Sequence, residues 1–240
     1  MKKLALFLLF IPVFSSLHAQ DTTNANFMRI ADILTNFERS ATFFSAITFQ
    51  PRENTKGTPY LFEQWTAMTL DSMGNKKVAR SVVYQANFDQ QKQQVIIKAG
   101  EEKAYAPDLK DVQAFHFKNG DTTYRYVNLL ADGKGRYMQM LVTGDYSLLK
   151  DVNVELRRAD YVNNGIIERG NNFDQYIKKN TYYLHGQNLN KKVALKEKDF
   201  LKALPAGQAK EAAAWLKNNN GAFDEMAAVH LISFLNEKKN

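Results

Sequence analysis

The segment "RYMQMLVTGDYSLLKDVNVEL", Arg136–Leu156, predicts a β-hairpin at the centre of this chain. In its second half, apolar residues recur on one face and polar residues fall on the other, as a strand with one buried and one solvated face requires. The first half is apolar on both faces, so we expect a central or covered strand. Between the halves, Gly144 and Asp145 tolerate the backbone conformations of a tight turn. Nothing in the hairpin suggests chemistry.

The same period of two extends over residues 60–186. The turns "SMGN", "DQQK", "KNGD" and "ADGKG" have hairpin chemistry. Strands joined by such local turns favour an antiparallel meander, which either lies against a second layer or closes partly into a barrel. The predicted strands are Leu61–Leu70, Val78–Phe88, Gln94–Lys98, Val112–Lys118, Thr122–Leu129, Arg136–Val142, Tyr146–Leu156 and Asp174–Leu184.

Helical periodicity precedes and follows the sheet. Asn26–Phe44 has apolar residues at a spacing of three to four, which predicts an amphipathic helix. Near the C-terminus we expect helices at Lys196–Leu204, Gln208–Lys217 and Ala222–Glu237. The predicted buried stripe of the last helix comprises Phe223, Met226, Ala227, His230, Leu231, Phe234 and Leu235.

The fold class is therefore α+β and mostly β. It is predicted as a single domain over residues 20–240, with an N-terminal helical segment (20–50), an antiparallel sheet (60–186) and C-terminal helices (195–238).

The first residues, "MKKLALFLLFIPVFSSLHAQ", have the organisation of a signal peptide. Lys2 and Lys3 precede an apolar run that is too short to span a bilayer as a mature anchor. We expect a signal peptide over residues 1–19, with cleavage after Ala19 and cleavage after Ser16 as the alternative. We expect export through the inner membrane, with a periplasmic location favoured over an extracellular one.

The composition limits the chemistry that this chain can perform. It contains no cysteine, which excludes a thiol-linked lipid anchor, disulfides and thiol nucleophiles. The formal charge is +7. The lysines are spread in pairs rather than concentrated in one block, and we interpret them as a solvated surface. An exported protein is not expected to bind nucleic acid.

No catalytic template is recognisable. The chain lacks an H-E-x-x-H zinc motif and a G-x-S-x-G nucleophile elbow. We interpret His116 and His230 as packing positions and His185 as a surface residue. "DGKGR", at 132–136, precedes a predicted strand rather than a helix, so it is a turn and not a phosphate loop.

Carboxylates leave one enzymatic alternative open. A paired-carboxylate hydrolase needs only two acids that are close in space, and the candidates by residue type are Glu63, Asp71, Asp108, Asp111, Glu155 and Glu168. This is no positive indication, so we assign no catalytic, cofactor-binding or metal-binding residue and expect no cofactor.

Tyrosines are frequent in the β region: Tyr124, Tyr126, Tyr137, Tyr146, Tyr161, Tyr176, Tyr182 and Tyr183. A tyrosine ring with its hydroxyl suits contact with glycans or peptides at a surface. Tyrosine also fills half-buried strand positions, and we favour this second interpretation.

Several segments together resemble uncharacterised exported proteins of Bacteroidota-type bacteria. These segments are "KGTPYLFEQW", "VVYQANFDQQKQQVIIK", "DVQAFHF", "MQMLVTGDYSLLKDVNVEL", "LKEKDFLKALP" and "AAWLKNNNGAFDEMAAVHLISFLN". The resemblance implies a β-rich exported domain with a helical C-terminus, and it supplies no site residue. At the end of the last helix this chain has "SFLN", where such relatives often have a Tyr-Tyr-Asn-like terminus.

We therefore expect a non-enzymatic periplasmic protein, without a transmembrane or lipid anchor, that binds an envelope protein, glycan or lipid. The expected binding surface is the solvated face of the sheet. The alternatives are a carboxylate-dependent envelope hydrolase and a β-barrel or cup that holds a lipid.

Overall fold

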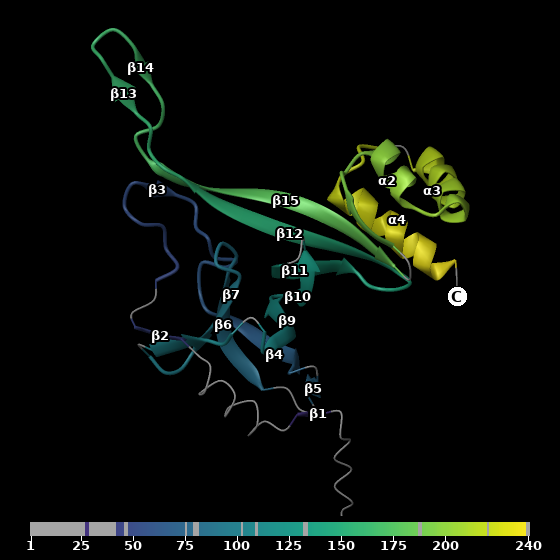
Figure 1. Cartoon of the computed structure of the whole chain (residues 1–240), viewed down its shortest axis with the longest axis horizontal. Helices are drawn as coiled ribbons and strands as arrows, with labels where there is room; N and C mark the ends of the chain where they lie inside the picture. Colours follow the sequence, from purple (N-terminus) through teal and green to yellow (C-terminus); the bar gives the residue numbers. More distant parts are fainter. Residues whose placement is uncertain are drawn as a thin grey trace, which may run out of the picture.

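A wide sheet followed by three helices forms the structure (Figure 1). The computed structural model describes residues 27–28, 42–45, 48–74, 76–78, 82–101, 103–108, 110–131, 134–186, 189–219 and 221–238. Within these residues one sheet has 14 strands, and its main path runs β16-β15-β12-β11-β10-β9-β4-β6-β7-β8-β2. The predicted signal peptide, 1–19, lies outside the described residues.

The strands of the main path are mostly those that the alternation predicted. Their bounds are β2 Thr42–Ser45, β4 Thr66–Met73, β6 Val83–Asp89, β7 Gln94–Lys98, β8 Lys103–Ala106, β9 Val112–Asn119, β10 Thr122–Ala131, β11 Lys134–Val142, β12 Tyr146–Arg157, β15 Asp174–Gly186 and β16 Leu189–Val193. Short strands β1 Phe27–Met28, β3 Thr55–Lys56 and β5 Lys76–Val78 attach beside this path. A separate hairpin consists of β13 Val162–Asn163 and β14 Glu168–Arg169.

The sheet is not one meander, which corrects the predicted topology. Strands β9 to β12, β15 and β16 follow one another in space, and so do β4, β6, β7 and β8, but the two series join where β4 pairs with β9. Two pairs are parallel, β1 with β5 and β3 with β15. The predicted partly closed barrel is also wrong, because β16 and β2 at the two ends of the path do not pair and the sheet stays open.

An aromatic core holds the first half of the sheet. Phe115 and Phe117 of β9 are 0% exposed, and Phe88 of β6 reaches them across the curved sheet. The ring of Phe115 stacks on Tyr126 at 5.2 Å and meets Tyr137 edge to face at 4.9 Å. Rings buried at this density contribute both transfer free energy and specific pair geometry. They form the buried face of this part of the sheet.

The β6–β7 turn is built into that core rather than left in solvent. Asn87 is fully buried, accepts from the Phe62 amide at 3.2 Å and donates to the Phe62 carbonyl at 2.9 Å. At the turn, Gln93 accepts a hydrogen bond from the Tyr137 amide at 2.8 Å. Lys178 of β15 donates to Gln90 at 2.9 Å. The turn therefore contacts strands β11 and β15, which are distant from it along the sheet path.

A second core lies where the helices cover the other half of the same sheet. The helices are α2 Glu197–Ala203, α3 Ala206–Asn218 and α4 Glu225–Glu237, close to their predicted bounds. They bury Leu148 and Leu184 of the sheet against Leu231 of α4, all 0% exposed. In Figure 1 the helices lie at one end of the long β12–β15 ribbon.

The hairpin at Arg136–Leu156 forms as predicted and is fixed by α4. Asn236 accepts from the Tyr146 amide and donates to the Tyr146 carbonyl, both at 2.9 Å. A Cβ at Gly144 would collide with the Asn236 side chain. Glycine is therefore required at this turn by the close approach of the helix.

Two helical predictions need correction. The predicted helix Asn26–Phe44 lies mostly outside the described residues, and its described ends, Phe27–Met28 and Thr42–Ser45, are strands. In α4, Met226 is 62% exposed and His230 is also exposed. The buried positions are Ala228, Leu231, Ile232 and Leu235, a stripe rotated from the predicted one.

Candidate functional site

The outer face of the sheet has one histidine–carboxylate pair. Nδ1 of His116 lies 2.9 Å from Asp71 of β4, and both side chains are partly exposed. Interpreting His116 as a packing residue was therefore wrong: Phe115 and Phe117 point into the core, so the alternation of β9 places His116 on the opposite face. Of the other histidines, the two that the structure describes, His185 and His230, are exposed.

The candidate acids make separate contacts. Asp71 pairs with His116, Asp108 with Lys110, Glu155 with Lys179, and Glu168 with Asn163. None of these contacts joins two of the candidate acids, and Glu63 and Asp111 belong to different loops. Among the described residues, no group of three His, Asp or Glu side chains is placed to hold a metal ion.

The tyrosines do not form one surface. Tyr126, Tyr137, Tyr146 and Tyr182 are buried. Tyr182 donates a hydrogen bond to Glu225 of α4, and burial followed by this bond raises its pKa to about 12. Most of the tyrosines therefore fill packing positions. Tyr161, which lies between β12 and β13, is 46% exposed.

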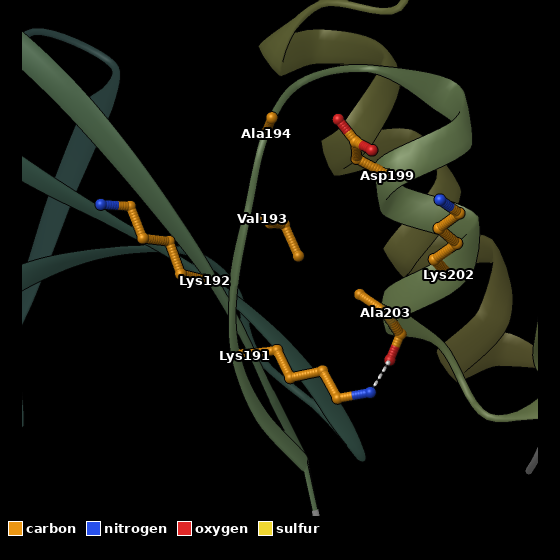
Figure 2. A pocket seen from close by; sticks show the side chains of 7 residues that line it. All are labelled: Lys191, Lys192, Val193, Ala194, Asp199, Lys202 and Ala203. Carbon is orange, nitrogen blue, oxygen red and sulfur yellow. Dashed lines mark hydrogen bonds between the residues drawn. The ribbon is translucent and has the colours of Figure 1, made fainter.

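A hollow between β16 and α2 contains three lysines (Figure 2). The Lys191 side chain crosses the hollow and donates to the carbonyl of Ala203 at 3.5 Å. Ala203 is the last residue of α2, and the partial negative charge at the C-terminal end of a helix favours a cation there. Lys192 points to the opposite side of the strand. The lysines thus do not converge on a common point, and the hollow is a joint between strand and helix.

Two larger hollows lie at the ends of hairpins. One of about 770 Å³ is lined by the β11–β12 turn, the end of β15 and the α2–α3 connection. The other, of about 590 Å³, lies beside Tyr124 and has the exposed side chains of Gln64 and Asn119 at its wall. The lining of the larger hollow includes Asp145, His185 and Lys191, whereas Glu63 is the one ionisable acid in that of the smaller hollow. Neither hollow is a predominantly apolar lipid cavity.

The most distinctive surface feature is an arm that projects from the sheet (Figure 1). We define the arm as residues 158–173, between the end of β12 and the start of β15; it contains the β13–β14 hairpin. In Figure 1 it extends from the end of the β12–β15 ribbon opposite the helices. From Asp160 to Gly165 an extended chain reaches about 16 Å.

Hydrogen bonds close the base of the arm. Arg158 pairs with Asp174 at 2.7 Å, and Asp174 also accepts from the Ala159 amide at 2.8 Å. The hydrogen bond from the Ala159 amide, and after it the bond from Arg158, hold the pKa of Asp174 below its ordinary value. Asp160 and Asn171 exchange two hydrogen bonds, at 3.0 and 2.8 Å. A Cβ at Gly170 would collide with the Asp160 carbonyl, so only glycine fits this base.

Asparagine side chains order the tip of the arm. Asn163 accepts from the Gly165 amide at 2.8 Å. Asn164 accepts from the amides of Ile166 at 3.1 Å and Ile167 at 2.8 Å. Gly165 has a φ of 81°, a conformation that favours glycine. Three consecutive backbone donors at the tip are therefore already bonded within the arm.

Despite this order, the arm leaves its apolar side chains in solvent. Ile166 is 90% exposed, Ile167 57%, and Tyr161 and Val162 46% each. Full burial of an isoleucine side chain stabilises a protein by about 1.5–3 kcal/mol. Because Ile166 and Ile167 remain exposed, they contribute little of this free energy to the fold. A group of exposed apolar side chains at the end of a projection is typical of an interaction surface.

The sequence contains a signal for the arm that the period-two analysis missed. "NNG" at 163–165 is turn chemistry, and "II" directly follows it. The strands β13 and β14 have only two residues each, which is too short for alternation to register.

Comparisons with known proteins identify no relative. No family model, no curated protein and no solved structure matches this chain significantly. Within the described part of the chain, none of the helices combines the length and apolarity needed to cross a membrane.

Proposed function

We propose that this chain is an exported, non-enzymatic binding protein that attaches to a component of the cell envelope through the tip of its arm. One observation carries the proposal: Ile166 and Ile167 are 90% and 57% exposed on a tip whose backbone is held in one conformation. A preorganised apolar contact loses little conformational entropy on binding. The signal-like residues 1–19 are the basis for placing the protein in the envelope.

This differs from the expected solvated sheet face as the contact surface. The partly exposed pair on that face, Asp71 with His116, is bonded within the chain, and Arg136 pairs with Asp151, which is only 7% exposed. Pairs that are satisfied within the chain gain little from a partner. The arm, by contrast, has apolar side chains without a place in either core.

Site-specific photo-crosslinking tests the proposal. A photoreactive residue at position 166, in protein exported by the producing cell, is expected to give an adduct with an envelope component. The matched control is position 226, because Met226 is also apolar and 62% exposed but lies on α4. Equal adducts from both positions, no adduct from position 166, or turnover of an envelope substrate by the purified protein would overturn the proposal.

A further inference from the structure

The side chains of the arm are ordered along its length. Ile166 and Ile167 form the tip, Tyr161 and Val162 follow on the shank, and the exposed Arg157 lies where the arm leaves the sheet. Tyr161 is five residues from Ile166, so it lies at most about 16 Å below the tip along the arm. The order from tip to base is Ile166 and Ile167, then Arg169 beside Val162, then Tyr161.

That order matches the layers of a membrane surface. Aliphatic side chains favour the acyl region, tyrosine is enriched at the level of the headgroups, and arginine and lysine contact lipid phosphates. A protein pocket imposes no such order. Protein interfaces instead concentrate their binding energy in aromatic and arginine side chains at one central point.

The exposed arginines at the arm and its base favour an anionic surface. Within the arm, Arg158 and Arg169 balance Asp160 and Glu168 in charge. Asp160 bonds to the Asn171 amide, Glu168 bonds to Asn163, and Arg158 pairs with Asp174 at the base. Arg157 and Arg169 are exposed, and Arg169 is only two residues from Ile167. Basic residues close to an inserted tip strengthen attachment to anionic lipid.

The tip is also prepared for removal from water. An unbonded amide in an apolar phase costs several kcal/mol. Here the amides of Gly165, Ile166 and Ile167 are all bonded to asparagine oxygens. The backbone of the tip can therefore enter the outer acyl region without exposing a free donor to it.

We infer that the tip of the arm inserts into the surface of an anionic lipid bilayer, with Ile166 and Ile167 in the outer acyl region and Arg169 and Tyr161 at the level of the headgroups and their phosphates. This rests on the proposed function and specifies its partner as lipid. Attachment is reversible, because two aliphatic side chains and a few basic residues are weaker than a lipid anchor.

Flotation of the purified mature protein with vesicles tests the inference. Vesicles of phosphatidylcholine are compared with vesicles that also contain phosphatidylglycerol, at low and high salt. We expect binding to the anionic vesicles, with weaker binding at high salt. The double variant Ile166→Ser/Ile167→Ser should bind more than tenfold more weakly. Arg169→Gln should weaken binding about fivefold, and Arg157→Gln, at the base of the arm, should weaken it less.

The control variant Met226→Ser removes an equally apolar exposed side chain from α4 and should bind like the unmodified protein. Wild-type binding no stronger than that of the double isoleucine variant would overturn the inference. If vesicles are not bound while position 166 still crosslinks to an envelope protein, lipid is the wrong partner and the proposed function stands. If both are absent, the proposed function fails as well.

Discussion

The body of the sheet and the arm are parts of the same β12–β15 ribbon, yet they are stabilised in opposite ways. In the body, Leu148 and Leu184 are 0% exposed beneath the helices. In the arm, Ile166 is 90% exposed. Its order comes from the hydrogen bonds between Asp160 and Asn171 and from those that Asn164 accepts from the Ile166 and Ile167 amides. Buried apolar side chains stabilise the body, whereas hydrogen bonds order the arm and its apolar side chains stay exposed to a partner.

This difference separates folding from binding. Side chains that contribute most to the stability of the body are distant from the tip, and the tip side chains make no core contact. Changes in the body should therefore alter the free energy of unfolding, and changes in the arm should alter attachment. Each of the following variants tests one side of that division.

The largest loss of stability is expected in the aromatic core. Phe115→Ala removes a 0% exposed ring that contacts Phe88, Phe117, Tyr126 and Tyr137. We expect the free energy of unfolding, measured by urea denaturation, to fall by about 3–5 kcal/mol. A loss below about 1 kcal/mol would mean that this cluster is not the core of the body.

Two matched hydroxyl deletions should have opposite signs. The Tyr126 hydroxyl is buried and has no hydrogen-bond partner among the described residues, whereas the Tyr137 hydroxyl donates to the Val112 carbonyl at 3.0 Å. We expect Tyr126→Phe to raise the free energy of unfolding by about 1 kcal/mol and Tyr137→Phe to lower it by about 1 kcal/mol. Chemical denaturation of both variants measures this, and equal signs would contradict the assigned bonding.

The Asp89 carboxyl should give the body a small pH dependence. Its burial raises its pKa above the ordinary value, opposed by hydrogen bonds from the Lys92 and Gln91 amides. The folded state then holds this proton more tightly than the unfolded state. This contribution to stability is therefore present below the unfolded pKa and is lost as pH rises through the folded pKa.

Asp89→Asn should remove that contribution while its side-chain oxygen still accepts from both amides. Unfolding free energies of the two proteins are compared across the acidic range. If the variant and the unmodified protein keep a constant difference at every pH, the carboxyl does not titrate as its burial requires.

The smallest effect on stability is expected at the tip. Ile166→Ser/Ile167→Ser changes two exposed side chains that lie outside both cores. We expect the free energy of unfolding to change by no more than about 0.5 kcal/mol, although the same variant should lose attachment. Thermal or urea unfolding checks the first expectation, and a loss of several kcal/mol would place these isoleucines in the folding core.

Local pattern predicted the elements better than their arrangement. Gln94–Lys98 and the hairpin at Arg136–Leu156 were predicted because alternation and turn chemistry are local properties. The pairing of β4 with β9 was not, because strand order depends on contacts between distant segments. In α4 the apolar residues surround much of the helix, so periodicity alone did not determine that Ile232 rather than Met226 is buried.

The candidate site was the least predictable part. Its strands are too short to show alternation, and the exposure of Ile166 follows from projection beyond the sheet, which no local pattern reports. The placement of His116 was available from the sequence, since it lies between two core phenylalanines in a strand.

The most direct test of the account is to remove the arm and leave the body. Residues 161–170 can be replaced by Asn-Gly, because Asp160 and Asn171 already face each other through two hydrogen bonds. Unfolding free energy and flotation with anionic vesicles are then measured on the same protein. We predict unfolding within about 1 kcal/mol of the unmodified protein and no vesicle binding. Loss of the folded body, or binding that persists without the arm, would contradict the account.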